Sequence, residues 1–200
     1  MLLNTVRFED EVDLFELADR LSAPPVAPVL LYGSSTIRLW DSAETDFPDW
    51  PLVRRGIGGA TLKECVFWAD RLVIRYAPSR IVLYAGDNDL ADGASPEEVM
   101  HQFQLLVHRI RHSLGDVPVA FISIKPSPAR WGIRAKILHT NHLVQTLINH
   151  HKHLQYVDTV PDMLNSHGLP RMELYLEDQL HLSPEGYRIW ADRLRDALDF

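Results

Sequence analysis

The stretch Ile81-Val82-Leu83-Tyr84-Ala85, followed at once by Gly86-Asp87-Asn88-Asp89, is the part of the sequence that decides the fold. Its first five residues are apolar at every position, which is typical of a β-strand covered on both faces. The polar turn that follows marks the point where the strand ends and a loop begins. A strand of this kind predicts a parallel sheet with helices on both sides.

Short apolar runs alternate with longer segments of helical periodicity along the rest of the chain. The candidate strands are Val29–Tyr32, Leu52–Arg54, Ile81–Ala85, Val117–Ile124 and Leu154–Val157. Helices are expected at Phe8–Leu21, after the capping boxes Thr61–Glu64 and Ser95–Glu98, at Arg134–Asn149 and after Ser183-Pro184. This alternation predicts an α/β fold with a parallel sheet. We expect one domain over residues 1–200, in which 1–27 form an N-terminal helix and its connector.

Composition and charge argue against several classes of protein. The 200 residues are 46% hydrophobic and 24% charged, as in an ordinary globular domain. A net charge of −7 disfavours a nucleic-acid partner, and no apolar run is long enough to predict a membrane-spanning helix. The acidic segment Met1–Asp13 does not resemble a signal peptide, and Cys65 has no second cysteine to pair with. We therefore expect a cytoplasmic protein with no membrane partner.

Sites in open parallel sheets form beyond the carboxyl ends of the strands. That rule selects the loops Gly33–Thr36, Gly56–Thr61, Gly86–Asp89 and Lys125–Arg130. Three of these loops contain groups that can serve acyl transfer, and the pair Asp178 and His181 precedes the last predicted helix.

Ser35 follows an apolar strand and a glycine, and a helical turn is expected after it at Thr36–Trp40. This position presents a hydroxyl above the edge of the sheet, with its own N–H near a helix N-terminus where negative charge is favoured. The triplet Ser34–Thr36 taken alone is better explained as a helix cap. Gly59 offers an unobstructed N–H, although the glycines of Gly56–Gly59 would also suit a tight turn with positive φ.

Asn88 can donate an amide N–H, or form an Asx-turn. Asp178 and His181 are close enough in sequence for the carboxylate to orient the imidazole toward a serine, although a surface salt bridge would need the same spacing. The acidic residues around Asp89 miss the calcium-binding loop pattern, so no metal site is expected. Cys65 lies in a predicted helix and is a poor candidate nucleophile.

Together these blocks make the chain resemble the SGNH hydrolases, also called the GDSL family of esterases and lipases. The resemblance runs from about Val29 to Leu194. The four family blocks correspond to Gly33-Ser34-Ser35, Gly56–Gly59, Gly86–Asp89, and Asp178 with His181. Their order along the chain makes the resemblance specific.

The resemblance implies a flavodoxin-like three-layer sandwich with a five-stranded parallel sheet. It also implies Ser35 as nucleophile, His181 as base and Asp178 as its orienter. The N–H groups of Ser35 and Gly59 and the side chain of Asn88 would form the oxyanion hole. No cofactor is implied.

Two positions depart from the family pattern. Ser34 stands where the family motif has aspartate, which leaves two adjacent serines to choose between, and Arg54 stands where asparagine is frequent. The segments 33–40 and 125–130 look like those of a bacterial subgroup of the family. Candidate substrate-binding residues are Ser34, Arg38, Lys125 and Arg130.

The function that these residues favour is hydrolysis of small carboxylic esters through an acyl-enzyme. Short acyl groups, including those carried on carbohydrate, are the expected substrates, because no long apolar lid is evident in the sequence. Two alternatives remain open on the sequence alone. The same site could pass the acyl group to a sugar or another alcohol, or the chain could be a binding protein that keeps the fold without catalysis.

Overall fold

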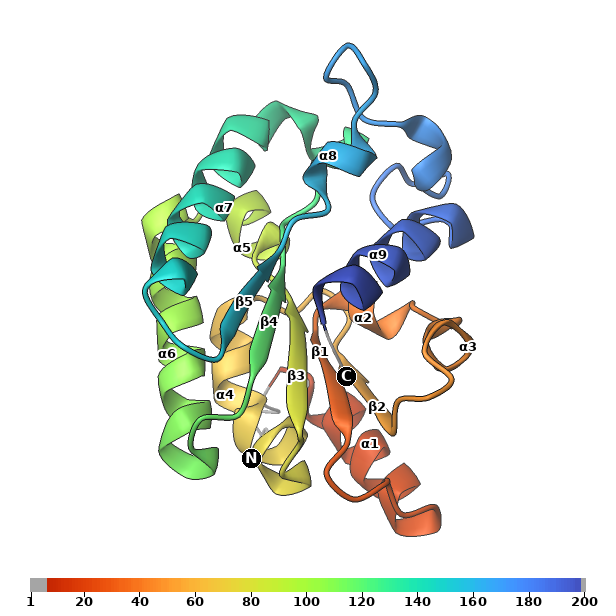
Figure 1. The fold of residues 1–200 in the computed structure, drawn as a ribbon, viewed down its shortest axis with the longest axis vertical. Coiled ribbons are helices and arrows are strands. Elements are labelled where there is room, and N and C mark those ends of the chain that lie inside the picture. The colour runs from red at the N-terminus through yellow and green to blue at the C-terminus, as the bar shows by residue number, and fades with distance from the viewer. Residues whose placement is uncertain (1–6, 199–200) are drawn as a thin grey trace, which may run out of the picture.

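A computed structural model describes residues 7–198 and shows a parallel sheet enclosed by helices (Figure 1). The five strands have the order β2-β1-β3-β4-β5, and every neighbouring pair is parallel. This is the flavodoxin-like strand order. The fold class expected from the sequence, an α/β sandwich with a five-stranded parallel sheet and helices on both faces, is confirmed.

The elements follow one another as strand, then helix, along most of the chain. The strands are β1 Val29–Gly33, β2 Leu52–Gly56, β3 Arg80–Tyr84, β4 Val119–Ile122 and β5 Leu154–Val157. The α-helices are α1 Glu9–Leu21, α2 Ser35–Arg38, α3 Ala43–Asp46, α4 Leu62–Leu72, α5 Asp87–Ala91, α6 Pro96–Leu114, α7 Arg134–Asn149, α8 Val160–Met163 and α9 Pro184–Ala197. The 3-10 helices are η1 Ile74–Tyr76, η2 Pro128–Ile133 and η3 Met172–Leu174.

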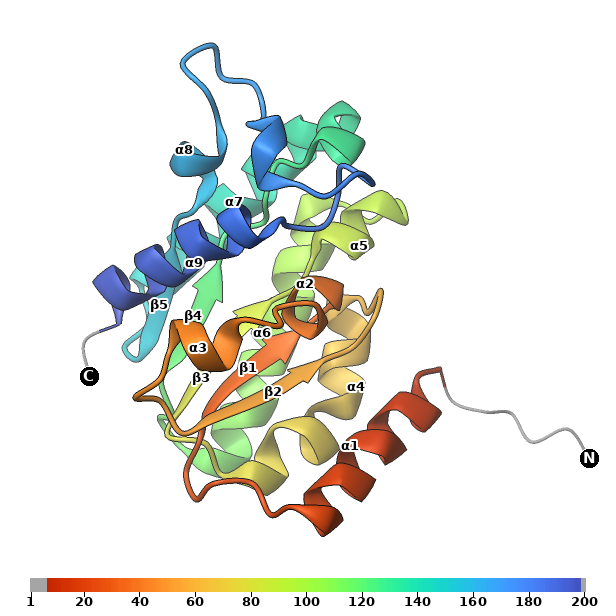
Figure 2. The ribbon, with the colours of Figure 1, turned by 90° about the vertical axis from the view of Figure 1, so that its right-hand side faces the viewer.

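Alternate residues of each strand supply two separate cores. Leu30 and Tyr32 of β1 face a core shared with α1, α4, α6 and α7, whereas Val29 and Leu31 face a core shared with α2, α3, α8 and α9. Figure 2 shows α3 and α9 in front of the sheet. Both faces of β1 are therefore buried, which explains why its sequence is a continuous apolar run. Within residues 7–198, no helix combines the length and hydropathy that crossing a membrane requires.

The expected strand Val117–Ile124 is longer than the ladder that forms, since β4 ends at Ile122. The side chain of Asn141, on α7, replaces a neighbouring strand beyond that point. Its Oδ1 accepts from the Ile124 N–H at 2.8 Å and its Nδ2 donates to the Ile124 carbonyl at 2.9 Å. Val117 and Ile124, at the two ends of the apolar run, are buried although both lie outside the strand. Both predicted capping boxes are present, at the starts of α4 and α6.

Glycines at the ends of β1 and β2 allow another backbone to come close, that of β3 at Gly33 and that of α2 at Gly56. A Cβ added to Gly33 would lie 1.8 Å from the Tyr84 carbonyl oxygen, and one added to Gly56 would lie 2.2 Å from the Arg38 nitrogen. A positive φ was expected from the sequence at Gly56, Gly58 and Gly59. That expectation is wrong for Gly56 and Gly58, because only Gly59 of the three has a positive φ, at 77°. Gly56 is required by close approach of two backbones.

Candidate active site

Ser35 is the first residue of α2 and stands at the carboxyl edge of the sheet. The chain leaves β1 at Gly33, and the Ser34 N–H donates to the Tyr84 carbonyl of β3 at 3.0 Å. Tyr187 of α9 donates its hydroxyl to the Thr36 carbonyl at 2.8 Å and so holds α2 from the other side. The serine thus stands on a short helix that is fixed to two different elements.

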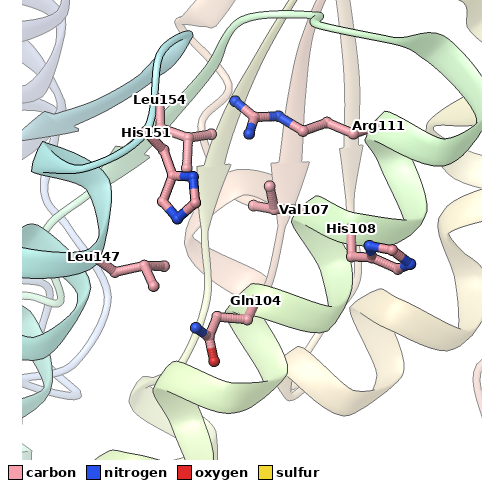
Figure 3. A pocket seen from close by; sticks show the side chains of 7 residues that line it. All are labelled: Gln104, Val107, His108, Arg111, Leu147, His151 and Leu154. Atoms are coloured by element: carbon pink, nitrogen blue, oxygen red, sulfur yellow. The ribbon is translucent and has the colours of Figure 1, made fainter.

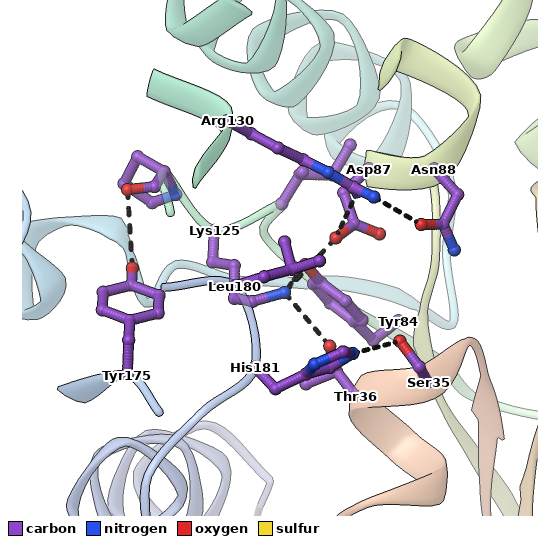
Figure 4. Close-up of polar contacts among 12 residues, drawn as sticks. Ser35, Thr36, Tyr84, Asp87, Asn88, Lys125, Arg130, Tyr175, Leu180 and His181 are labelled. Carbon is purple, nitrogen blue, oxygen red and sulfur yellow. Dashed lines mark hydrogen bonds and ion pairs between the residues drawn. The ribbon is translucent and has the colours of Figure 1, made fainter. Parts of the chain in front are cut away.

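Figure 4 shows the Ser35 hydroxyl beside the imidazole of His181, which comes from the opposite end of the sequence. The Ser35 Oγ lies 3.0 Å from His181 Nε2, and His181 Nδ1 lies 2.5 Å from Asp178 Oδ2. Because an ionised carboxylate only accepts hydrogen bonds, the proton on the ring belongs on Nδ1. Nε2 is then free to accept the serine proton.

The Asp178 carboxylate is fixed by its own turn. Its Oδ1 accepts from the backbone N–H groups of Leu180 and His181, each at 2.9 Å. Gln179 between them adopts a φ of 57°, and its carbonyl accepts from the Ala129 N–H of η2 at 3.0 Å. Partial burial raises the pKa of Asp178, but the hydrogen bonds from His181 and from the two N–H groups outweigh it and lower the pKa to about 2. The group is therefore ionised at neutral pH.

Burial distinguishes the two adjacent serines. Ser34 is 0% exposed, and its Oγ has no hydrogen-bond partner among residues 7–198. Ser35 alone meets the imidazole. The burial of Ser34 contradicts the expectation that it binds substrate, and its place under the start of α2 is the physical reason.

Asn88, in the first turn of α5, lies beside the loop that follows β2. Its Nδ2 donates to the Ala60 carbonyl at 2.9 Å, which brings the amide next to Gly59. Gly59 has a left-handed backbone with open space over its Cα. In Figure 4 the Asn88 side chain lies on the same side of the site as Ser35. The three expected oxyanion donors thus belong to adjoining loops at one edge of the sheet.

Lys125 does not face the open site. It is 1% exposed, and its Nζ lies 3.0 Å from the Tyr84 hydroxyl, 3.1 Å from Thr36 Oγ1 and 3.3 Å from Asp87 Oδ2. This burial contradicts the expected role of Lys125 in binding substrate. Arg130 is also engaged within the protein: its Nη1 lies 2.9 Å from Asp87 Oδ2 and its Nη2 donates to Asn88 Oδ1 at 2.7 Å.

Arg38 has a side chain that is 50% exposed and lies against Gly58, where an added Cβ would come within 2.8 Å of the guanidinium carbon. It is the one candidate substrate-binding residue that the structure leaves at the surface near Gly59. Arg54 instead donates to the Arg38 carbonyl at 3.0 Å and pairs with Asp41 at 3.2 Å. The arginine at this departure from the family pattern therefore braces α2.

Asp89 caps a helix rather than contributing to a metal site. Both of its carboxylate oxygens accept from the Leu62 N–H at the start of α4, at 3.0 and 3.1 Å. Burial raises its pKa to about 6, an effect that this hydrogen bond partly opposes. Within the described part of the chain, no three His, Cys, Asp or Glu side chains are grouped to hold a metal ion. Cys65 lies buried in α4, and burial raises the pKa of its thiol.

Sequence comparison decides which family the chain comes from. The profile of the GDSL-like lipase/acylhydrolase family matches residues 32–189. The chain belongs to this family. A GDSL-like lipase/acylhydrolase acts on esters, so the prediction of an ester-hydrolysing enzyme is confirmed.

Solved structures of similar fold include a GDSL-like lipase, a lipase/acylhydrolase and a carbohydrate esterase. A GDSL-like lipase of Bacteroides thetaiotaomicron aligns with a TM-score of 0.79 and 20% identity over 92% of this chain and 95% of that one. A lipase/acylhydrolase of Enterococcus faecalis aligns with a TM-score of 0.68 and 19% identity over 83% and 92%. A family 3 carbohydrate esterase of Clostridium thermocellum aligns with a TM-score of 0.69 and 15% identity over 86% and 95%. At these identities the likeness shows the fold. No curated protein matches the chain.

A separate cavity lies between α6 and α7 of this GDSL-like protein (Figure 3). It measures about 210 Å³, and its walls combine apolar residues such as Val107 and Leu147 with the polar residues His108, Arg111 and His151. None of its lining residues belongs to the loops at the carboxyl edge of the sheet. The cavity is thus distinct from the site around Ser35.

Sequence reasoning missed the groups that support the site. Asp87, one of the acidic residues beside Asp89, has no role in the sequence-based assignment of the site, and it lies between the cations of Lys125 and Arg130. Glu11 of α1 was not considered, and its carboxylate accepts from the Gly58 N–H at 3.3 Å. A lysine placed directly after a buried strand was the one signal that pointed to an internal ion pair.

Proposed function

We propose that this chain hydrolyses small carboxylic esters through a covalent acyl-enzyme formed on Ser35. The observation that carries this proposal is the continuous hydrogen-bonded path from Ser35 Oγ to His181 Nε2 and from His181 Nδ1 to the Asp178 carboxylate. Nucleophile, base and orienter of this kind are the parts that acyl transfer requires.

In the first step, His181 Nε2 takes the hydroxyl proton while Ser35 Oγ attacks the ester carbonyl carbon. The carbonyl oxygen becomes an oxyanion that accepts hydrogen bonds from the Ser35 N–H, the Gly59 N–H and Asn88 Nδ2. The tetrahedral intermediate collapses when the alkoxide leaves with the proton from His181. Asp178 keeps the imidazole in the required tautomer throughout.

In the second step, water attacks the acyl carbon and gives a proton to His181. The second tetrahedral intermediate releases the carboxylic acid, and the proton returns to Ser35 Oγ. An alcohol that replaces this water would receive the acyl group, so transfer to a sugar differs from hydrolysis only in the acceptor.

Short acyl groups, including those carried on sugars, are the substrates that we propose. The His181 and Asp178 side chains are 22% and 47% exposed, so the site is open to an ester on a bulky alcohol. A carbohydrate esterase is also among the proteins of similar fold. We further propose that the chain works as one domain without a cofactor or a nucleic-acid or membrane partner. A cytoplasmic location is likewise a proposal, and it is supported by the single cysteine.

A series of p-nitrophenyl esters of increasing acyl length tests this function. We expect acetyl and butyryl esters to give the highest kcat/KM, and Ser35→Ala or His181→Ala to lower kcat by about four to six orders of magnitude. Ser34→Ala is the matched control and should retain activity, because its hydroxyl has no partner to lose. Activity that survives Ser35→Ala would refute the proposal. Ester products formed with added alcohol would favour the transferase alternative.

A further inference from the structure

A buried polar cluster lies beneath the site and has no role in the steps above. It consists of Lys125, Asp87 and Arg130, and Figure 4 shows it reaching from Thr36 to Asn88. Three oxygen atoms lie around the Lys125 Nζ, which matches the three donors of an ammonium group. Burial raises the pKa of Asp87, but Lys125 and Arg130 outweigh it and hold that pKa below its usual value. Two cations thus share one carboxylate.

Arg130 contacts the side chain that the proposed mechanism uses for the oxyanion. Its Nη2 donates to Asn88 Oδ1 at 2.7 Å, while Asn88 Nδ2 donates to the Ala60 carbonyl at 2.9 Å. A primary amide has one oxygen and two N–H donors. Arg130 therefore fixes which end of the amide is the nitrogen, and the Ala60 carbonyl takes one of the two N–H groups. One N–H remains.

We propose that Arg130 is a positioning residue that holds the Asn88 amide with its remaining N–H directed at the oxyanion. The inference rests on the proposed function, since it assigns a task only if an oxyanion forms at this site. Asp87 holds the guanidinium in place through its contact of 2.9 Å, and Lys125 holds Asp87. Through Thr36 Oγ1, the same cluster also ties the helix of the nucleophile to the oxyanion loop.

The chemistry of the arginine suits this task. A planar guanidinium holds its nitrogens at fixed angles, so Nη1 forms an ion pair with Asp87 while Nη2 donates to Asn88, whereas a lysine ammonium is a single point.

The competing role for Arg130 is direct binding of an anionic substrate. The two roles differ in how they combine with loss of Asn88. A positioning residue that acts through Asn88 has nothing left to position once the amide is removed, so the effects are not additive. A residue that binds substrate directly loses the same factor whether or not Asn88 is present.

A double-mutant cycle with Arg130→Met and Asn88→Ala separates these roles. We expect Asn88→Ala to lower kcat about 10²–10³-fold, and Arg130→Met to lower kcat about 10- to 100-fold, because a displaced donor costs up to that much. When Asn88→Ala is already present, adding Arg130→Met should lower kcat further by less than roughly threefold. Arg134→Met on the neighbouring α7 is the control and should leave kcat unchanged.

All rates are taken per active site titrated with a fluorophosphonate, so that a fall in folded protein is not counted as a fall in kcat. KM should change little in each variant, and neutral and anionic esters should lose the same factor. Fully additive losses, or a loss confined to KM for anionic esters, would overturn the positioning role while leaving the proposed function intact. If Asn88→Ala and Ser35→Ala both keep wild-type kcat, the proposed function itself fails.

Discussion

Replacing Asp178 with asparagine should inactivate the enzyme by putting a proton on the wrong nitrogen of His181. The Asp178 Oδ1 accepts two backbone N–H groups at 2.9 Å, so the oxygen of an asparagine would take that place. Its NH₂ group would then face His181 Nδ1 at the position of the present 2.5 Å contact. Because an NH₂ group donates, Nδ1 must accept, and the ring proton moves to Nε2. Nε2 could no longer take the proton of Ser35.

The expected loss in kcat for Asp178→Asn is about 10³–10⁴, the size associated with a reversed histidine tautomer. Asp178→Ala should lose roughly tenfold less. The Asp178 side chain is 47% exposed, so water can enter the vacated space and accept from Nδ1–H. An uncharged isostere is therefore expected to be worse than a truncation.

Stability should change little in Asp178→Asn. The folded pKa of about 2 lies below the ordinary value, so ionised Asp178 stabilises the fold above pH 4, and that contribution is lost as the pH falls from about 4 to 2. Because the group is nearly half exposed, solvent screening reduces this contribution to about 1 kcal/mol. Urea unfolding at pH 7 checks it.

Initial rates on p-nitrophenyl acetate at saturating substrate measure kcat for wild type, Asp178→Asn and Asp178→Ala, each normalised to folded protein. The tautomer argument is refuted if Asp178→Asn stays within about tenfold of wild type, or if Asp178→Ala loses more than Asp178→Asn.

Two further predictions concern the scaffold. Gly33→Ala should lower the free energy of unfolding in a urea titration by about 3 kcal/mol or more, because the new Cβ would lie 1.8 Å from the Tyr84 carbonyl oxygen. Gly132→Ala is the control. Its new Cβ would have no atom within 4 Å, so its free energy of unfolding should be nearly unchanged. Burial raises the pKa of Asp89 to about 6, so the folded protein binds a proton there that the unfolded chain loses near pH 4. The free energy of unfolding should therefore fall by at most about 3 kcal/mol as the pH rises from 4 to 6. Asp89→Asn should flatten that slope, and an unchanged slope would contradict the assignment.

The fold could be predicted from the sequence because strands buried on both faces leave a plain signal. The apolar runs of β1 and β3 are continuous, and α7 was expected at its observed bounds, Arg134–Asn149. Strand ends were less predictable. Burial continues past the end of β4, where the Asn141 side chain forms hydrogen bonds with both backbone polar groups of Ile124. No local sequence pattern encodes a contact between positions so far apart.

The candidate site was predictable where each functional group stands in a short motif. Ser35, Asn88, Asp178 and His181 each stand in such a motif, and the structure brings Ser35, His181 and Asp178 into contact. Lys125 was misassigned because a cation after a strand can face either solvent or the interior. Lys125 faces the interior because its ammonium group pairs with Asp87, which lies 38 residues away in the sequence. Only the folded structure shows this buried ion pair.

The most direct test of the central claim is to find which residue a fluorophosphonate labels, by mass spectrometry of peptides from the inactivated enzyme. The predicted result is one phosphonyl group on Ser35, with none on Ser34, and greatly slowed labelling in His181→Ala. A label on Ser34 or on another residue, or labelling of Ser35 at an unchanged rate without His181, would contradict the account.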